Sequence, residues 1–471
     1  MALAARAPWR VLEGFGGAQR AAARIAAPRD LEGLRRALHA AREERLTVTL
    51  RGAGRSYGDA ALAAGGVALD MTGMNRVLAW DEAEGVATVE PGVTIEQLWR
   101  TILPHGFWPT VVPGTMFPTL GGCVAMNVHG KNAWRVGPIG DHVRALDLMT
   151  ADGAVRTLSR TQEPELFRAA IGGAGWLGVV TRIEIEAKRV ASGRLRVTPL
   201  RTRTLRGMFE LFEARSGAAD YLVGWVDAFA RGPQLGRGLV HDARYLAAAE
   251  DPDGRAWLDP ARQDLPPSVL GVPRSLAWRA MKPFSNDPGM RFVNALKWRL
   301  PERTGRDGSY LETHVAFAFL LDYVPGWRRA YDPRGFIQVQ LFLPDAAARQ
   351  GFERALTLCQ QRGTVPYLAV FKRHREDEFL ISHGLDGWSL ALDFPVPPDR
   401  DRLWATAREL TALTLDHGGR FYPAKDSVVD ANSFARSLGD RLTRFLALRR
   451  TLDPDALFTT AQARRLLPGC D

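Results

Sequence analysis

Over the first 190 residues, short apolar stretches alternate with segments of helical spacing. Residues 31–42 place apolar side chains at every third or fourth position, which is typical of an amphipathic helix. Residues 46–50 alternate apolar and threonine side chains, which predicts a strand. This strand leads directly into the glycine-rich segment 51–59. A strand followed by a glycine loop is the order that a phosphate-binding site requires.

Similar patterns predict the other elements of this first part. A hairpin is expected at 76–80 and 86–89, and Thr94 and Gln97 have the spacing of a capping box that opens a helix. A second hairpin is expected from strands at 143–150 and 154–158. A short helix is expected at 165–171, and a long strand at 179–187.

After residue 192 the glycine clusters give way to longer helices between strands. From residue 336 the pattern predicts a split β-α-β-β-α-β unit with an antiparallel sheet. Its elements are expected at 336–343, 346–361, 367–373, 389–395, 400–415 and 420–422. Residues 251–310 are rich in proline, glycine and arginine but carry many apolar side chains. We expect a long loop there, acting either as a mobile lid or membrane contact, or simply packed on its own domain.

Composition favours a globular protein of two structural domains. The chain has 471 residues, of which 46% are hydrophobic and 24% charged. No apolar run reaches the roughly 18 residues that span a bilayer, and no secretory signal is present. We therefore expect a cytoplasmic protein, with peripheral association at the inner membrane as an additional expectation. Cys123, Cys359 and Cys470 are far apart, so neither a disulfide framework nor a metal site is expected.

The net charge of +10 arises almost entirely from arginine, since only six of the 62 basic residues are lysine. The arginines are spread evenly, which favours a compositional origin over a nucleic-acid surface and leaves attraction of an anionic partner as the alternative. In such a chain a lysine suggests a need for its compact ammonium or its tunable pKa. Lys131, Lys372 and Lys425 all lie within motif-like segments.

The segment 51–59 reads RGAGRSYGD and departs from a Rossmann fingerprint. Its third glycine, Gly58, comes one residue late, and no long helix follows. A second small-residue segment covers 113–132. A helix starting near Gly121 would direct free N–H groups at an anion. The two segments together predict a phosphate cradle of another nucleotide fold.

With these segments in order, the chain resembles the vanillyl-alcohol-oxidase-like flavoproteins, in which a cap interrupts a PCMH-type FAD-binding domain. The motifs that carry the resemblance are at 51–59, 129–132, 146–153, 370–372, 393–395 and 422–427. The resemblance implies an α+β fold with an FAD-binding domain at 1–192, an inserted substrate cap on an antiparallel sheet at 193–418, and a C-terminal return to the FAD-binding domain at 419–471. The candidate mobile lid at 251–310 falls within this cap.

The resemblance also implies which residues hold FAD. Covalent members of the superfamily place a histidine where this chain has Arg55, so non-covalent FAD is expected. The cofactor-binding residues it implies are Arg51, Gly52, Ala53, Gly54, Arg55, Ser56, Tyr57, Gly58, Asp59, Gly114, Thr119, Leu120, Gly121, Gly122, Met126, Asn127, Val128, His129, Val180 and Tyr422.

Oxidising an alcohol requires a hydride acceptor, which the flavin supplies, and a proton acceptor from the protein. The implied catalytic residues are Lys425, His129 and Tyr57. The alternatives are a surface lysine paired with Asp426, a structural histidine and a packing tyrosine. The implied substrate contacts are Lys131, Asn132, Gln338, Gln340, Lys372, Ser389 and Ala391, and relatives place an asparagine at 389, a thiol at 391 and an aromatic at 374.

By the same resemblance, the expected reaction is oxidation of the 2′-hydroxyl of a polyprenyl-phosphoryl pentose to a ketone. A short-chain reductase partner would then complete an epimerisation in arabinose-donor synthesis for the cell wall. The alternative within the fold is a soluble alditol or aldonolactone oxidase. From another class, the alternative is a non-catalytic basic protein that binds nucleic acid or membrane.

Overall fold

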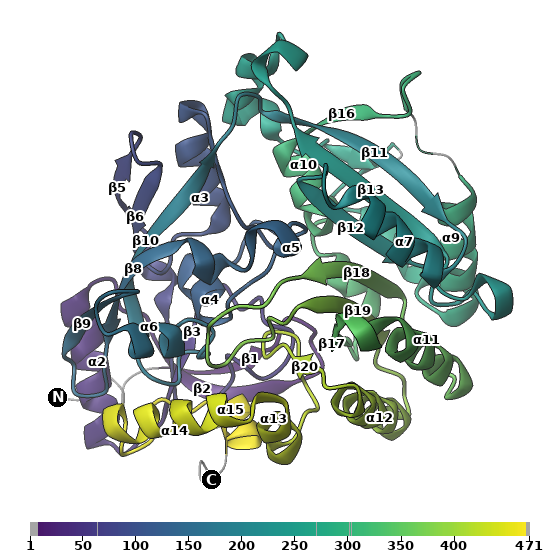
Figure 1. Ribbon diagram of the computed structural model, residues 1–471. Coiled ribbons are helices and arrows are strands. Elements are labelled where there is room, and N and C mark those ends of the chain that lie inside the picture. The colour runs from purple at the N-terminus through teal and green to yellow at the C-terminus, as the bar shows by residue number, and fades with distance from the viewer. Residues whose placement is uncertain (1–7, 64, 270, 301, 303, 468–471) are drawn as a thin grey trace.

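The computed structural model describes residues 8–467 except 64, 270, 301 and 303. Figure 1 shows a lobe built from the N- and C-terminal parts of the chain, beside a lobe built from its middle. We call them the N-terminal lobe and the inserted lobe. No helix among the described residues is long and apolar enough to span a bilayer.

The first sheet of the N-terminal lobe has the order β1 (Trp9–Glu13), β2 (Arg20–Ala26), β4 (Val67–Asp70) and β3 (Val48–Arg51). The last three strands are parallel. Helix α2 (Leu31–Glu43) begins where Asp30 caps it, and its apolar stripe packs against β3 and β4. The predicted strand and helix that precede the glycine loop are thus confirmed.

The second sheet has the order β5 (Val77–Asp81), β6 (Val86–Val89), β10 (Val179–Arg189), β8 (Val143–Met149) and β9 (Val155–Ser159), with β7 (Phe107–Pro109) also paired to β10. Helix α3 (Ile95–Ile102) opens with the predicted capping box of Thr94 and Gln97. Two shorter helices, α4 (Leu120–Ala125) and α6 (Pro164–Ala170), also belong to this lobe.

The inserted lobe is built on an eight-stranded antiparallel sheet. Its order is β16 (Tyr310–Thr313), β11 (Arg194–Thr202), β13 (Gly238–Tyr245), β12 (Tyr221–Val226), β18 (Leu368–His374), β19 (Gly387–Pro395), β17 (Phe336–Pro344) and β20 (Arg420–Phe421). Helices α7 (Leu205–Arg215), α11 (Asp345–Gln361) and α12 (Arg400–Asp416) form one apolar core with the sheet. The predicted split unit is therefore confirmed, and with it the mixed α+β fold.

The segment 251–310 differs from the long loop that we expected. It forms helices α8 (Ala277–Met281) and α9 (Asp287–Arg299), short 3-10 turns and a small hairpin of β14 (Ser268–Val269) and β15 (Val272–Pro273). Asn286 caps α9, and Trp298 donates to the Thr202 carbonyl at 2.9 Å. The proline and glycine content concealed these elements, because Pro288 and Gly289 are placed in the first turn of α9, where they are tolerated.

After β20 the chain returns to the N-terminal lobe. Helices α13 (Ala431–Leu438), α14 (Asp440–Leu452) and α15 (Ala461–Leu466) lie along the edge formed by the earliest elements (Figure 1). Val48 donates to the Leu457 carbonyl at 2.7 Å, and Thr459 donates back to Val48 at 3.0 Å. Because β20 pairs with β17, the sheet of the inserted lobe extends slightly past the expected boundary at 418.

Candidate active site

A cavity with a volume of about 1350 Å³, its mouth included, lies among the glycine-rich segments of the N-terminal lobe. Fourteen of the expected cofactor residues line it: Gly52, Ala53, Gly54, Arg55, Ser56, Tyr57, Gly114, Thr119, Gly121, Gly122, Met126, Val128, Val180 and Tyr422.

The loop 51–59 forms one wall of the cavity and is held at its base. The Arg51 guanidinium donates to the carbonyls of Glu13 and Ala61, at 3.1 and 3.3 Å. A Cβ at Gly52 would lie 2.1 Å from Thr119 Oγ1, so only glycine permits this approach. Within the described part of the chain, the backbone N–H groups of residues 53–56 donate to no protein acceptor. Free N–H groups of this kind form a nest suited to a pyrophosphate.

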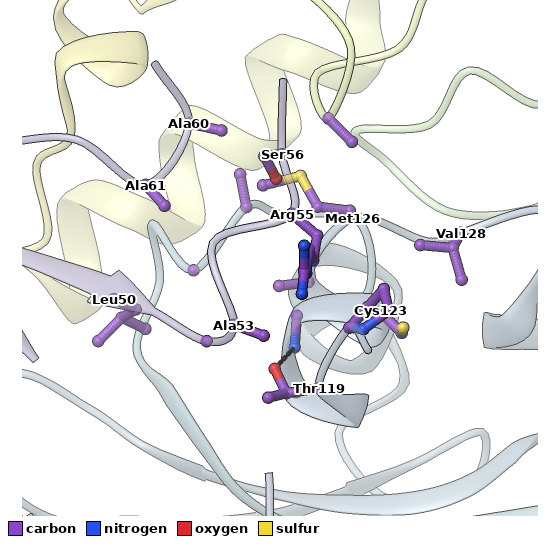
Figure 2. A pocket seen from close by; sticks show the side chains of 18 of the residues that line it. Leu50, Ala53, Arg55, Ser56, Ala60, Ala61, Thr119, Cys123, Met126 and Val128 are labelled. Atoms are coloured by element: carbon purple, nitrogen blue, oxygen red, sulfur yellow. Dashed lines mark hydrogen bonds between the residues drawn. The ribbon is translucent and has the colours of Figure 1, made fainter. Parts of the chain in front are cut away.

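Arg55 lies between this loop and helix α4 (Figure 2). Its guanidinium stacks on Phe15 and Phe117, at 5.3 and 5.2 Å from the ring centroids. Its Nε is buried without a hydrogen-bond partner among the described residues, and burial lowers the pKa of the group, which still remains cationic. A half-buried cation with a buried, unused donor at the cavity complements an anionic ligand.

Helix α4 does not act as we expected. The N–H groups of Leu120 and Gly121 donate to the carbonyls of Val93 and Pro91, at 2.7 and 2.8 Å. The Gly122 N–H donates to its cap, Thr119 Oγ1. The prediction of free N–H groups at this helix was therefore wrong, because a preceding loop and the cap already satisfy them. Gly121 and Gly122 instead provide a smooth wall without side chains.

Six expected cofactor residues lie behind the wall of the cavity. Arg51 anchors the glycine loop as described, and Leu120 is a core residue. Asn127 adopts a positive φ of 44° and is held by Asp377 and Ser382 through its side-chain nitrogen. Gly58, Asp59 and His129 complete the set; a Cβ at Gly58 would lie 2.1 Å from the Asp426 carbonyl oxygen.

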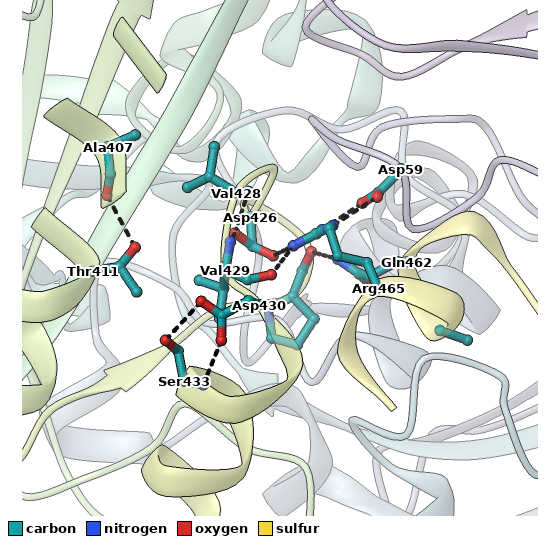
Figure 3. A network of polar contacts seen from close by, with 12 residues as sticks. Asp59, Ala407, Thr411, Asp426, Val428, Val429, Asp430, Ser433, Gln462 and Arg465 are labelled. Carbon is teal, nitrogen blue, oxygen red and sulfur yellow. Dashed lines mark hydrogen bonds and ion pairs between the residues drawn. The ribbon is translucent and has the colours of Figure 1, made fainter. Parts of the chain in front are cut away.

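A buried ion triad joins the end of the glycine loop to the C-terminal helices (Figure 3). The Arg465 guanidinium contacts both carboxylate oxygens of Asp59, at 2.7 and 3.0 Å, and Asp426 at 2.7 Å. It also donates to the Val429 carbonyl. Asp426 is thus engaged by Arg465, and the pairing of Lys425 with Asp426 that we considered does not occur. The triad fixes the residue next to Lys425 relative to the loop.

The inserted lobe presents a polar sheet face to this region. On β17, Gln338 and Gln340 point to this face while Ile337, Val339 and Leu341 pack into the helical core. Their cross-strand partners on β19 are Asp393 and Ala391, and Lys372 on β18 pairs with Ser389. The predicted substrate residues on these strands therefore lie together.

Lys425 lines the cavity where it meets the polar sheet face. Its Nζ lies 3.5 Å from the Tyr57 ring centroid, and Tyr57 also packs edge-on against Phe336. Enclosure lowers the pKa of Lys425, Asp393 opposes this shift and Lys372 adds to it. Burial raises the pKa of Asp393, which accepts a hydrogen bond from Gln338. A lysine with a lowered pKa at a cavity is able to accept a proton.

His129 lies next to this group among other histidines. Its Nε2 is 3.2 Å from Gln340 Nε2, and its Nδ1 is 3.5 Å from Lys372 Nζ. The rings of His374 and His383 lie 4.8 and 5.1 Å away. Burial lowers the pKa of His129 well below its usual value, and the nearby cations add to the shift, so the imidazole is neutral.

Lys131 and Asn132 are committed elsewhere. Lys131 Nζ donates to the Phe317 carbonyl and lies over its ring, and enclosure lowers its pKa to about 7. Asn132 donates to the Thr110 carbonyl at 2.8 Å. Both side chains brace the wall in this structure, whereas Lys372 Nζ lies beside His129.

Several site residues escaped the sequence prediction. A further glycine cluster at 172–178 lines the cavity through Gly173, Ala174, Gly175 and Gly178, and the cluster itself was the available signal. Asp393 lies in the motif at 393–395 but was not expected to be a site residue. The remaining ones come from distant segments: Leu321, Asp322, His383 and Arg465. Among the described residues no cluster of three potential metal ligands is present.

Comparison with known proteins identifies the class. A family model described as an FAD binding domain matches residues 22–159. The chain belongs to the PCMH-type FAD-binding oxidoreductases and is an FAD-dependent enzyme acting on CH–OH groups. It is 32% identical over 466 residues to decaprenylphosphoryl-beta-D-ribose oxidase from Mycolicibacterium smegmatis, with 97% of each chain covered. It is also 31% identical to cytokinin dehydrogenase 2 from Oryza sativa subsp. japonica over 236 residues, covering 46% of this chain and 40% of that protein.

The cavity fits FAD by its own geometry. The free N–H groups of 53–56 and the Arg55 cation suit the pyrophosphate, and the small residues of 119–125 and 172–178 permit close approach of flat rings. Bound there, FAD supplies the hydride acceptor for alcohol oxidation. Lys425, Tyr57 and Tyr422 line the same cavity and border the polar sheet face.

Proposed function

We propose that the protein oxidises the 2′-hydroxyl of a pentose carried on a polyprenyl phosphate to a ketone. The observation that carries the proposal is the position of Lys425 between the cavity and the polar face of β17 and β19. The similarity over 97% of the chain to an oxidase whose name specifies a decaprenylphosphoryl ribose supports the substrate class.

In this proposal the chain positions the sugar and accepts its hydroxyl proton. Neutral Lys425 accepts the proton at Nζ, and Asp393 nearby stabilises the ammonium that forms. Gln338, Gln340 and His129 orient the sugar hydroxyls. Lys372 binds the phosphate as a point charge. Tyr57 covers Lys425 and limits water access, which favours the neutral amine.

Anaerobic mixing of the holoprotein with a synthetic polyprenyl-phosphoryl ribose tests the proposal. Loss of flavin absorbance within the mixing experiment, with a 2′-keto product by mass spectrometry, is the expected result. The matched control is the same pentose phosphate without its lipid. Bleaching by free alditols or aldonolactones, with none by the lipid-linked sugar, would contradict it.

That second outcome describes a soluble alditol or aldonolactone oxidase, which one observation favours. Lys131 is held by the Phe317 carbonyl, so the expected pair of phosphate-binding lysines is reduced to Lys372. Peroxide release with free sugars would identify this activity. The positive charge of the pocket does not separate the two activities well, because a lipid-linked sugar phosphate and a free sugar would meet the same cationic pocket.

We further propose that the keto product is reduced by a short-chain reductase partner, which gives net epimerisation at C2′. The chemistry requires such a step, because a ketone intermediate must receive a hydride from the opposite face. Incubation of the holoprotein, lipid-linked ribose and candidate reductases with labelled nicotinamide cofactor would test it. Label at C2′ of an arabinose product is expected, whereas a ketone that persists in every mixture would contradict it.

A further inference from the structure

A chain of buried hydrogen bonds joins Gln340 to Ser389 and His374. Gln340 Nε2 lies 3.1 Å from Ser389 Oγ, and Ser389 Oγ lies 2.8 Å from His374 Nε2. All three side chains are buried. His374 ends this chain; its ring packs edge-on against His129, with the centroids 4.8 Å apart, and it borders a surface depression also lined by Trp134, Arg373 and Asp386.

One atom of the Gln340 amide lies within hydrogen-bond distance of two partners, His129 Nε2 at 3.2 Å and Ser389 Oγ at 3.1 Å. If this atom is the nitrogen, it donates to both, and His129 carries its proton on Nδ1. If it is the oxygen, it accepts from both, and His129 carries its proton on Nε2. The orientation of the Gln340 amide therefore determines the direction of both its hydrogen bonds, to His129 and to Ser389.

The Ser389 hydroxyl transmits this choice to His374. If the Gln340 amide nitrogen faces Ser389 and His129, Ser389 accepts a hydrogen bond from Gln340 and its hydroxyl donates to His374 Nε2. If the amide oxygen faces them, Ser389 donates to Gln340 and accepts a hydrogen bond from His374 Nε2–H. Burial and neighbouring cations lower the pKa of His374 well below its usual value, so the ring is neutral and has one N–H to place.

Lys372 controls the other end, because its Nζ lies 3.5 Å from His129 Nδ1. An ammonium has only donors and therefore requires an unprotonated Nδ1. A neutral amine accepts, which permits Nδ1–H. Lys372 is faced by Lys131, His129, Lys425, His374 and His383, and burial lowers its pKa to about 8. The ammonium form therefore predominates at neutral pH.

We propose that His374, acting through Ser389 and together with Lys372 at the other end, is a positioning residue that fixes the Gln340 amide and thereby selects which nitrogen of His129 carries the proton. At neutral pH the amide oxygen faces His129, and His129 is protonated on Nε2. The meaning of this choice for catalysis rests on the proposed function, but the hydrogen-bond direction itself does not.

The experiment records two-bond 1H–15N spectra of holoprotein labelled at its nine histidines, between pH 6 and 9. His129→Gln assigns the His129 signal. The wild-type protein is expected to show the Nε2–H tautomer below about pH 8 and a growing Nδ1–H fraction above it. His374→Phe and Ser389→Ala are each expected to lower the Nε2–H to Nδ1–H ratio at least fivefold at pH 7.

Two variants serve as matched controls. Ser389→Thr keeps the hydroxyl and should restore the wild-type ratio, and His39→Gln changes an exposed histidine on α2 and should leave it unchanged. Flavin absorbance of each variant reports whether the fold is retained. A wild-type tautomer in both His374→Phe and Ser389→Ala would overturn the proposal. Because no substrate is added, this outcome is independent of whether lipid-linked ribose is oxidised.

Discussion

At the scale of single residues, enclosure decides the protonation of the lysine at the cavity. Lys425 packs against Tyr57, and desolvation lowers its pKa more than the buried Asp393 raises it. A lysine whose pKa approaches the working pH serves better as a proton acceptor than one at the ordinary value. The same chain uses arginine almost everywhere else for a positive charge.

Replacing Lys425 by arginine should abolish this proton acceptor and leave a permanently charged group in its place. The rate of anaerobic flavin reduction in the wild-type protein should rise with pH as Lys425 loses its proton, at a pH below that of free lysine. In Lys425→Arg the rate should be about 10²–10⁴-fold lower and independent of pH, because the guanidinium stays protonated. The exposed Lys282→Arg is the control. A near wild-type rate and pH profile in Lys425→Arg would show that Lys425 is not the proton acceptor.

Arg55 leads to a prediction about the cofactor bond. Its guanidinium stands where covalent relatives carry a histidine and cannot form that bond, so the protein should release its flavin on acid precipitation. Absorbance of the supernatant and of the dissolved pellet, compared with the holoprotein, measures the released fraction. More than nine-tenths in the supernatant is expected. Flavin that stays with the washed pellet would show that another residue forms the bond.

At the scale of elements, α15 and the glycine loop depend on each other. The Arg465 guanidinium joins Asp59, at the end of the loop, to Asp426, beside Lys425. Removing one member of a buried ion pair leaves uncompensated charge and costs about 3–5 kcal/mol. Here the removal would leave two neighbouring carboxylates unpaired. The triad therefore connects stability to cofactor binding.

Arg465→Gln should lower both the stability of the protein and its affinity for FAD. Urea unfolding is expected to show a loss of about 3–5 kcal/mol. Titration of the apoprotein with FAD should show at least tenfold weaker binding, because the loop is no longer held. Arg464→Gln, on the exposed side of the same helix, should change neither. If Arg465→Gln matches Arg464→Gln in both measurements, the triad does not support the loop.

At the scale of the whole molecule, Asp322 of the inserted lobe fastens the two lobes at the cavity. It accepts hydrogen bonds from Thr115 Oγ1 at 2.7 Å and from the Met116 N–H at 2.8 Å. Arg274, from the segment 251–310, donates to its carbonyl at 3.0 Å, and the adjacent Leu321 lines the cavity. Burial raises the pKa of Asp322 to about 6.

This contact should weaken as the pH rises. While Asp322 contacts Thr115 and Met116, in what we call the closed state, its pKa is about 6, whereas an exposed carboxyl has a pKa of about 3.9. The closed state thus binds the proton more tightly and is favoured at low pH, and this advantage is lost as the pH rises through about 6. Hydrogen exchange, corrected for intrinsic rates, should show about tenfold less protection of the Met116 N–H at pH 7 than at pH 5. Asp322→Asn should remove the pH dependence; a dependence that persists there would assign it to another group.

The sequence by itself determined the local elements and the cofactor class. Periodicity predicted α2 and the split unit from β17 to β20, since a segment that buries one face repeats at the period of its backbone. A capping box predicted α3. The glycine clusters predicted the cavity wall, because close approach to a ligand excludes side chains. Alternation along β17 was enough to place Gln338 and Gln340 on one face.

Only the tertiary structure decided what the polar residues contact. The hydrogen bonds from Leu120 and Gly121 to a preceding loop, the capture of Lys131 by the Phe317 carbonyl, and the pairing of Arg465 with Asp59 join segments far apart in the chain. No periodicity encodes such pairs, because each depends on where two separately folded elements meet. The same holds for pKa values, since the burial that shifts them exists only after the lobes have packed.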